Sequence, residues 1–200
     1  MDESEYILVG IGEEWESESP DISLKEAYEK LKLLVGDKDY FLVTTAFDGL
    51  IHDMGFAAER LVAPCGDRSR LQCSAACTDQ LWRRGKEPSD GLCPHCRAPL
   101  TANTIETKPY VEAGYLPQWE IYMGWLQKSV NRKLFILELG VGFRTPTVIR
   151  WPFEKTAYLN QKSSFCRVHE KLSQLPDNLG GRGISVAENS VDWLINGTIF

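Results

Sequence analysis

Two short pairs of cysteines constrain the fold of this chain more than any other feature. Cys73 and Cys77 form the first pair, and Cys93 and Cys96 form the second, with fifteen residues between the two pairs. Pairs at this spacing can form two knuckles that bring four thiolates to the corners of a tetrahedron around Zn²⁺. The sequence between the pairs is polar and rich in turn residues, which is typical of a segment stabilised by a metal. We therefore predict a zinc-ribbon insert over residues 71–100.

Four thiolates leave no open coordination position, so we expect a structural zinc rather than a catalytic one. The alternative is four buried thiols without a metal, which explains neither the two knuckle spacings nor the polar surroundings.

No apolar run approaches the roughly 20 residues of a membrane span, and no basic segment precedes the apolar residues near the N-terminus. We expect a cytoplasmic protein, because in that reducing compartment cysteines bind metals, act in catalysis or lie buried.

The remaining sequence alternates between apolar runs and helical patterns. The predicted strands cover 6–9, 40–43, 60–63, 134–137, 164–168 and 183–186. The predicted helices cover 24–35, 119–130 and 190–195. Since most of the strands are apolar on both faces, this order predicts an α/β fold with a parallel sheet and helices on both of its faces.

Two of the predicted strands end in Gly-x-Gly turns. Gly10 and Gly12 follow the first strand, and Gly140 and Gly142 follow the strand at 134–137. Backbone N–H groups in such turns can bind a diphosphate, although the same pattern occurs wherever a turn needs positive φ. Acidic residues occupy much of 13–18, directly after the first turn. If they pointed inward they would repel a diphosphate, whereas pointing outward they would not.

The segment after the second glycine turn adds a cation. Arg144 could bind a phosphate together with the backbone N–H groups of the turn. Thr145 and the proline after it predict a helix that begins there, and Pro152 is expected to stop or kink that helix early.

The charge of the chain excludes several kinds of partner. Its 22 basic residues against 28 acidic ones give a net charge of −6, which argues against binding to nucleic acid or to an anionic membrane. The aromatic residues after the insert favour core packing, with a groove for a protein or peptide substrate as the alternative. The oligomeric state stays unknown.

The order of these motifs resembles the sirtuins over nearly the whole chain. The residues that carry the resemblance are the stretch Thr44-Thr45-Ala46-Phe47-Asp48-Gly49-Leu50, the slot Ala63-Pro64-Cys65-Gly66, the four-cysteine ribbon and Glu138-Leu139-Gly140-Val141-Gly142. Gly66-Asp67 leading into Leu71-Gln72-Cys73-Ser74 looks like the branch linked to macrodomains. Sirtuins are NAD-dependent protein deacylases with a Rossmann-like sheet and a zinc module, and that branch is known for protein ADP-ribosylation. The resemblance implies a Rossmann-like nucleotide-binding domain over 1–70 and 101–200.

The same resemblance implies a set of site residues. Cys65 and Asp48 stand at catalytic positions of the family. The cofactor-binding positions, for NAD or ADP-ribose, are Gly10, Gly12, Thr44, Asp48, Gly140, Gly142, Arg144, Thr145 and His169.

Three departures from the family pattern bear on activity. Ala46 stands where sirtuins have an Asn that helps to place the water and the ribose. Cys65 stands where they have a catalytic His, or a Gln in the macrodomain-linked branch, and an unperturbed thiol titrates too high to act as a base near neutral pH. Between Gly12 and Thr44 there is room for one helix only. We therefore predict a catalytically degenerate, NAD- or ADP-ribose-binding zinc protein, with an active deacylase or mono-ADP-ribosyltransferase as the alternative.

Overall fold

A computed structural model describes residues 4–18 and 22–197 and contains a large parallel sheet. Its strands are β1 (Tyr6–Ile11), β2 (Asp39–Thr44), β3 (Leu61–Val62), β7 (Leu134–Leu139), β8 (Ser164–Val168) and β9 (Gly183–Val186). They lie in the order β3-β2-β1-β7-β8-β9, and every pair is parallel. All six predicted strands are therefore present.

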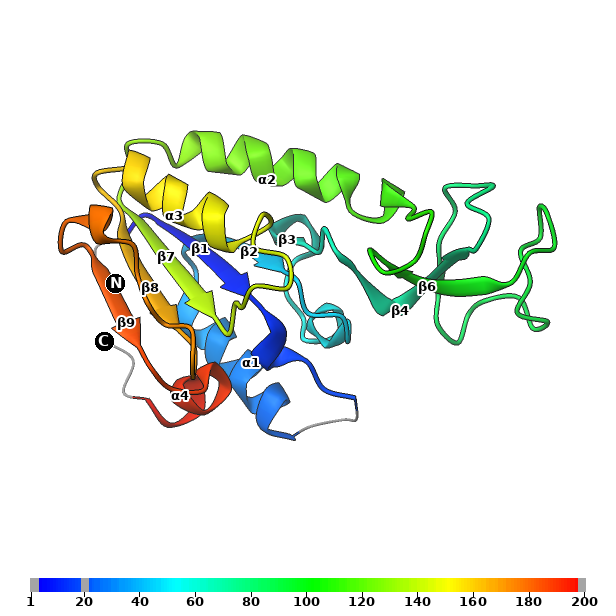
Figure 1. Cartoon of the computed structure of the whole chain (residues 1–200), viewed down its shortest axis with the longest axis horizontal. Helices are drawn as coiled ribbons and strands as arrows, with labels where there is room; N and C mark the ends of the chain where they lie inside the picture. The colour runs from blue at the N-terminus through cyan, green and yellow to red at the C-terminus, as the bar shows by residue number, and fades with distance from the viewer. Residues whose placement is uncertain (1–3, 19–21, 198–200) are drawn as a thin grey trace.

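Helices cover both faces of this sheet (Figure 1). Helices α1 (Ile22–Val35) and α4 (Ser190–Asn196) lie on one face, and α2 (Leu116–Lys128) and α3 (Arg150–Leu159) on the other. Side chains that alternate along each strand feed two separate cores, so that Val9 of β1 belongs to the first core and Leu8 to the second. The predicted α/β architecture is confirmed.

Five short 3₁₀ helices lie between these strands and helices in the described part of the chain. They are η1 (Glu13–Trp15), η2 (Leu50–Asp53), η3 (Ala58–Arg60), η4 (Glu112–Gly114) and η5 (Asp177–Leu179). Between Gly12 and Thr44, α1 is the one α-helix in the described part of the chain, as predicted.

The prediction of a helix start at Thr145 is wrong. Residues 142–149 form a loop with turns, and α3 begins only at Arg150. Pro152 neither stops nor shortens this helix. It is the third residue of α3, in the first turn, where a backbone N–H has no partner inside the helix and its loss costs little.

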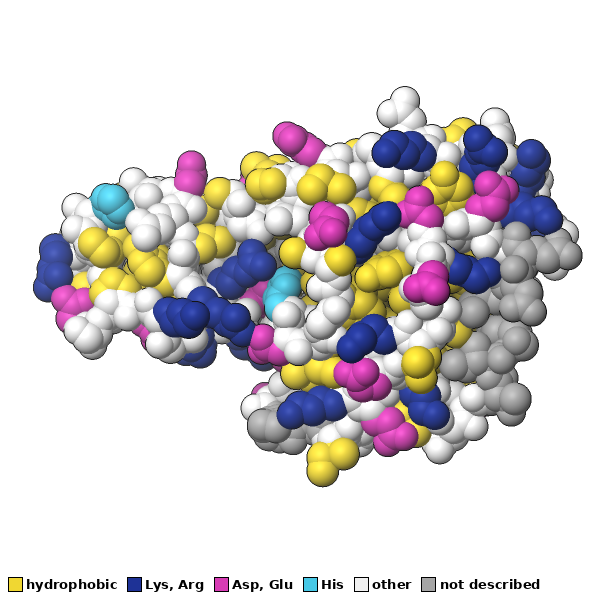
Figure 2. Space-filling view, turned by 180° about the vertical axis from the view of Figure 1, so that it is seen from behind, with side chains coloured by type: hydrophobic (Ala, Val, Ile, Leu, Met, Phe, Trp, Pro, Cys, Tyr) yellow, Lys and Arg dark blue, Asp and Glu magenta, His cyan; other side chains and the backbone are white. Residues whose placement is uncertain are grey.

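A second, antiparallel sheet projects from the large one (Figures 1 and 2). Its strands are β4 (Gly66–Cys73), β5 (Trp82–Arg83) and β6 (Leu100–Thr104), in the order β5-β4-β6. In the described residues, its hydrophobic core consists of four buried side chains, those of Leu71, Cys73, Trp82 and Cys93. Such a small core indicates that another interaction must hold this sheet together.

The connections of the large sheet create one special edge. From β1 the chain moves outward to β2 and β3, and after the second sheet it returns to the other side of β1 as β7. The carboxyl ends of β1 and β7 therefore lie side by side where the strand order reverses, which is the usual ligand-binding edge of such sheets. In the described residues, no helix has the length and apolar character needed to cross a membrane.

Candidate functional site

The two glycine turns pack directly against each other at the ends of β1 and β7. A Cβ atom on Gly12 would lie 2.4 Å from the carbonyl oxygen of Gly140, and Gly140 itself has a φ of +63°. Gly10 lies deeper, where a Cβ would meet Ile149 and Phe153 of the neighbouring layer. Close packing therefore accounts for these three glycines whether or not a nucleotide binds.

The second glycine turn and Arg144 gather around carboxylates. The N–H groups of Gly142 and Arg144 donate to the two carboxylate oxygens of Glu13, at 2.7 and 3.1 Å. The Arg144 guanidinium pairs with both oxygens of Glu16, with Nη1 at 3.0 Å from Oε2. We call the N–H groups of Gly142 and Arg144, together with the Arg144 guanidinium, the donor cluster. Four converging donors of this kind form an anion-binding site.

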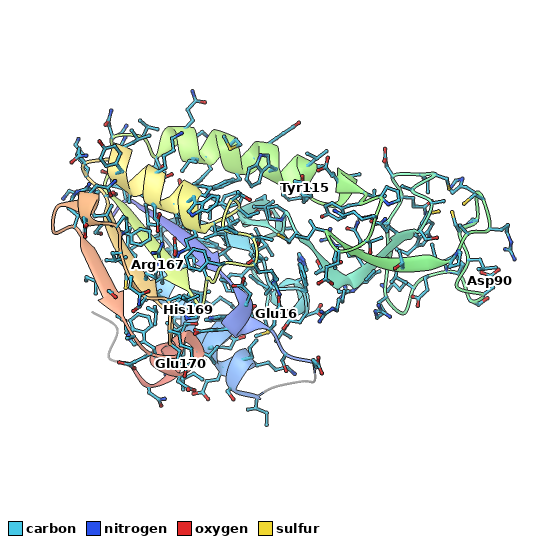
Figure 3. All side chains as sticks on the ribbon, viewed as in Figure 1. Glu16, Asp90, Tyr115, Arg167, His169 and Glu170 are labelled. Carbon is cyan, nitrogen blue, oxygen red and sulfur yellow. The ribbon has the colours of Figure 1, made fainter. Side chains whose placement is uncertain are left out.

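Glu14 occupies a neighbouring set of donors at the end of β8. Its carboxylate accepts the N–H of Glu170 at 2.9 Å and that of Ser190 at 2.8 Å. Its Oε1 atom also lies 3.0 Å from Nδ1 of His169. The labelled side chains Glu16, His169 and Glu170 lie near one end of the large sheet in Figure 3. His169 therefore lies at the predicted nucleotide-binding edge of the sheet, and its partner there is Glu14.

Trp15 anchors the segment that carries these glutamates. Its side chain is fully buried, its Nε1 donates to Ser190 Oγ at 3.0 Å, and its ring meets Tyr28 of α1 edge-on. Because this anchor holds η1 in place, Glu13 and Glu14 project toward the N–H groups. Of the two orientations considered for the acidic run, the inward one is therefore correct for Glu13, Glu14 and Glu16.

The end of β2 carries two further predicted residues, Thr44 and Asp48. Thr44 is buried, and its Oγ1 accepts the N–H of Ala46 at 3.1 Å. The Asp48 carboxylate accepts the N–H of Leu50 at 3.0 Å and that of Ser17 at 3.3 Å. Burial raises the pKa of Asp48, although these hydrogen bonds act against that change. Asp48 therefore ties the acidic segment to β2.

Cys65 is buried just before β4. Its thiol lies 3.7 Å from the Oγ1 of Thr145, to which it donates a weak hydrogen bond. Burial raises the pKa of this thiol, and the Thr145 hydrogen bond and the charge of Arg144 offset the effect only in part. The thiolate form is therefore disfavoured at neutral pH, and a neutral thiol is a poor general base.

Cys65 lies beside a groove of about 460 Å³ between the two sheets. The aromatic residues of the groove are Tyr110, Tyr115 and Trp119. The rings of the two tyrosines are nearly parallel, with centroids 6.1 Å apart. Thr145 also lines this groove, so the groove contains residues of the predicted site together with residues that follow the four-cysteine insert.

A buried amide network fixes the aromatic wall of this groove to the second sheet. Asn103 of β6 donates through Nδ2 to Gln72 Oε1 at 2.7 Å and to the carbonyl of Val111 at 2.9 Å. The same Gln72 oxygen accepts the N–H of Val111 at 2.9 Å, and Gln72 Nε2 donates to the carbonyl of Pro109 at 2.7 Å. Both amide side chains are almost completely buried. The segment from Pro109 to Val111 is therefore held by β4 and β6.

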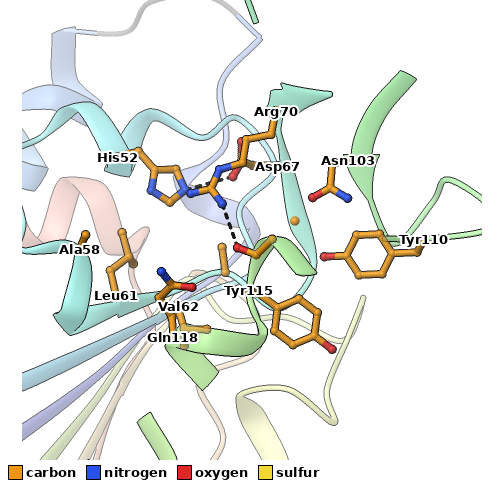
Figure 4. Close-up of a pocket in the computed structure, with 13 residues that line it drawn as sticks. His52, Ala58, Leu61, Val62, Asp67, Arg70, Asn103, Tyr110, Tyr115 and Gln118 are labelled. Carbon is orange, nitrogen blue, oxygen red and sulfur yellow. Dashed lines mark hydrogen bonds and ion pairs between the residues drawn. The ribbon is translucent and has the colours of Figure 1, made fainter. Parts of the chain in front are cut away.

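A histidine–aspartate pair that the sequence did not reveal lines a small neighbouring cavity of about 40 Å³ (Figure 4). His52 Nε2 lies 3.0 Å from Asp67 Oδ2, and the Asp67 side chain is 2% exposed. Burial alone would raise the pKa of Asp67, but the hydrogen bond and charge of His52, with help from Ser69, hold it below its ordinary value. These two residues are fifteen positions apart, and no local spacing pattern links them.

Replacing His52 with leucine is expected to reduce the free energy of unfolding at neutral pH by about 1–3 kcal/mol, because the buried Asp67 carboxylate loses a partner. The pKa of Asp67 in the native protein lies below its ordinary value of 3.8, so the ionised carboxylate stabilises the fold at every pH above 3.8. That contribution to the free energy of unfolding is lost as the pH falls through the lowered pKa. In His52→Leu the loss should begin at a higher pH. Urea unfolding over a pH series measures it, and identical profiles would contradict it.

The four ribbon cysteines converge at the end of the second sheet. Their sulfur atoms all lie within 4.8 Å of one another, and three of the pairs are 3.4 to 3.6 Å apart. Tetrahedral zinc with Zn–S bonds of about 2.3 Å requires S···S distances of about 3.8 Å. The cluster therefore fits a closed zinc site as predicted from the spacing of the pairs.

Both knuckles have backbone that suits a tight turn around a metal. Ala76 and Arg97 adopt positive φ, of 45° and 65°, and follow the first ligands of each pair. The N–H of Ala76 donates to the carbonyl of Cys73, and that of Arg97 to the carbonyl of Cys93. These turns direct both cysteine pairs to one point.

Comparison with known proteins gives two sequence relatives of interest, while no protein-family model matches the chain. The chain is 27% identical over 205 residues to a protein ADP-ribosyltransferase from Staphylococcus aureus, covering 88% of this chain and 64% of that protein. It is 29% identical over 138 residues to a probable bifunctional ADP-ribose hydrolase/ADP-ribosyltransferase from Fusarium oxysporum f. sp. cubense, covering 58% of this chain and 23% of that protein. The chain therefore spans less than two thirds of the length of either relative.

Solved structures of Sir2 homologues share the fold. A mutant Sir2 homologue in complex with ADP-ribose matches with a TM-score of 0.62 and 11% identity, covering 96% of this chain and 90% of that one. A second mutant, in complex with 2'-O-acetyl ADP-ribose, matches with a TM-score of 0.61 and 12% identity over the same shares. The parallel sheet, the second sheet with its cysteine cluster and these likenesses agree that the chain has a Sir2-like fold.

Proposed function

We propose that this protein binds an ADP-ribose-containing nucleotide at the carboxyl edge of its large sheet and is catalytically degenerate. The observation that carries the proposal is the donor cluster. Two backbone N–H groups and the Arg144 guanidinium converge on oxyanions at the reversal of strand order, where Glu13 and Glu16 now lie. The same geometry suits the oxygens of a diphosphate.

The likeness to Sir2 homologues solved with ADP-ribose supports this ligand class. His169 and the N–H of Glu170 lie at the neighbouring strand end, where an adenosine ribose would extend from the diphosphate. In the proposed complex, these groups and the donor cluster would bind the nucleotide, while the zinc ribbon would hold the shape of the second sheet.

Two features favour a degenerate site. Cys65 stands beside the groove as a buried thiol with a raised pKa, so it does not supply a base for a ribose hydroxyl. Ala46 is buried and offers no polar side chain at the end of β2, and Asp48 is already bound by two backbone N–H groups. The residues that would activate the sugar are therefore missing or engaged.

The test is a titration of the zinc-loaded protein with ADP-ribose and NAD by calorimetry, followed by an assay for nicotinamide release. We expect ADP-ribose to bind and no nicotinamide to be released above the rate of the Cys65→Ser variant, because neither side chain acts as a base at neutral pH. Absence of binding by both ligands would refute the proposed function.

The alternative is an active NAD-dependent mono-ADP-ribosyltransferase acting on a protein or peptide. The sequence similarity to the protein ADP-ribosyltransferase from Staphylococcus aureus favours it, and the groove beside Cys65 offers room for a peptide. Nicotinamide release that depends on Cys65 and on an added protein acceptor would favour this alternative over the degenerate protein. Deacylation of an acyl-lysine peptide would instead favour a deacylase.

A further inference from the structure

We propose that Glu13 and Glu16 form a carboxylate gate that determines which ligands enter the nucleotide site. The two carboxylates occupy the donor cluster, and a diphosphate must displace them before it can bind there. This inference rests on the proposed function, because it concerns how the same site selects its ligand.

The first step is that gate and ligand would compete for the same donors. The N–H groups of Gly142 and Arg144 both donate to Glu13, and each has one hydrogen to donate. The guanidinium of Arg144 pairs with Glu16 and lies over the ring of Phe47, 4.0 Å from its centroid. A diphosphate bound at the donor cluster would therefore replace these bonds rather than add to them.

The second step is that the carboxylates are held in place by the fold. The side chains of Glu13 and Glu16 are only 26% and 19% exposed. Glu16 also accepts the N–H of Phe47 at 2.8 Å, which fastens it to the end of β2. Trp15, between them in the sequence, is fully buried. The fold therefore holds both carboxylates of the gate in position, and their contacts with Arg144 are more persistent than those of a solvent-exposed ion pair.

The third step concerns selectivity. A diphosphate can open the gate, because its oxygens accept the hydrogen bonds that the displaced carboxylates gave up, but breaking the carboxylate contacts reduces its net affinity. A neutral nucleoside has no group that needs the donor cluster, so it binds without displacing the gate. If the gate does not open, its two negative charges repel an incoming diphosphate. The gate therefore lowers the affinity for every diphosphate-containing ligand, and leaves the binding of a neutral nucleoside such as adenosine unchanged.

The variants Glu13→Gln and Glu16→Gln test the gate, because each keeps the size of the side chain and removes its charge. Glu26→Gln is the matched control: Glu26 lies exposed on α1, and its replacement changes the net charge of the protein equally. We expect each gate variant to bind ADP-ribose about tenfold more tightly than the native protein, and the control to bind as the native protein does. Adenosine affinity should be the same in all four proteins.

Inorganic pyrophosphate separates a failure of the gate from a failure of the proposed function. If pyrophosphate binds the gate variants more tightly than the native protein while ADP-ribose binds none of them, the gate stands and nucleotide binding is refuted. If ADP-ribose binds all four proteins equally, nucleotide binding stands and the gate is overturned. If neither probe binds any variant, both are overturned. Near-ultraviolet circular dichroism, to which the buried Trp15 and the other aromatic side chains contribute, checks that the variants remain folded.

Discussion

Replacing Arg167 with methionine is expected to lower the free energy of unfolding by about 3–5 kcal/mol, because the change leaves a buried carboxylate without its partner. Arg167 of β8 and Glu138 of β7 lie opposite each other in the sheet, and both side chains are fully buried. Nε of Arg167 lies 2.6 Å from Glu138 Oε2, and Nη2 lies 2.7 Å from Glu154 Oε1. Arg167 is labelled beside β8 of the large sheet in Figure 3.

The control for this prediction is the double variant Glu138→Leu/Arg167→Met. Replacing both members of a buried ion pair with apolar side chains removes the need to desolvate either charge, so much of the lost stability should return. Urea unfolding of the native, single and double variants measures both effects. Equal destabilisation of the single and double variants would show that lost packing, rather than the unpaired carboxylate, sets the cost.

The same pair has a pH dependence with a definite sign. Burial raises the pKa of Glu138 to about 7, although its hydrogen bond and ion pair with Arg167 act in the opposite direction. A carboxyl group with a raised pKa binds its proton more tightly in the folded state, so its contribution to stability is complete below the ordinary value near 4.5 and is lost as the pH rises through about 7. In Arg167→Met the loss of stability as the pH rises should be larger, because the guanidinium that stabilises the ionised Glu138 from the neighbouring strand β8 is gone.

Removal of zinc is the second change with a large expected effect. Native mass spectrometry should show one Zn²⁺ per chain, and a Cys93→Ser variant should retain none. Structural zinc contributes apparent binding free energies of about 10–16 kcal/mol in small metal-stabilised folds. The hydrophobic core of the second sheet has only four buried side chains in the described residues, so we expect this sheet to unfold locally without the metal, while the large sheet remains folded.

Hydrogen exchange distinguishes local from global unfolding here. Amides of β4 and β6 should lose their protection in Cys93→Ser or after chelation, and amides of β1 and β7 should keep theirs. Cys166→Ala provides the control, because Cys166 is buried in β8 of the large domain and should be replaceable without loss of zinc. Full protection of the second sheet in the metal-depleted protein would contradict a structural role for zinc.

Much of the fold could be predicted because its signals are local. Strands β1, β2 and β7 each contain a run of at least three apolar residues, and the two cysteine pairs have a spacing that zinc geometry explains. The start of α3 could not be found in the same way. Thr145 and the proline after it have the residue types of a helix start, but in the structure Thr145 faces the thiol of Cys65 from a loop.

The candidate site was only partly visible in the sequence because its contacts are long-range. Glu13 and Gly142 are 129 positions apart, and Glu14 and Ser190 are 176 positions apart. The acidic run after Gly12 showed that charge was present, but only the burial of Trp15 determines which way the carboxylates point. Arg150, buried and bound to the carbonyl of Val141, gave no signal at all, since nothing local distinguishes it from a solvated arginine.

The amide network of Gln72 and Asn103 couples two distant parts of the protein. It joins β4, which ends in Cys73 of the four-cysteine cluster, to the segment that carries Tyr110 on the wall of the groove. Any molecule that binds in the groove and contacts this wall would therefore also stabilise the strands that carry this cluster. By reciprocity, a bound zinc ion would raise the affinity of the groove for such a molecule by the same factor by which the molecule raises the affinity for zinc.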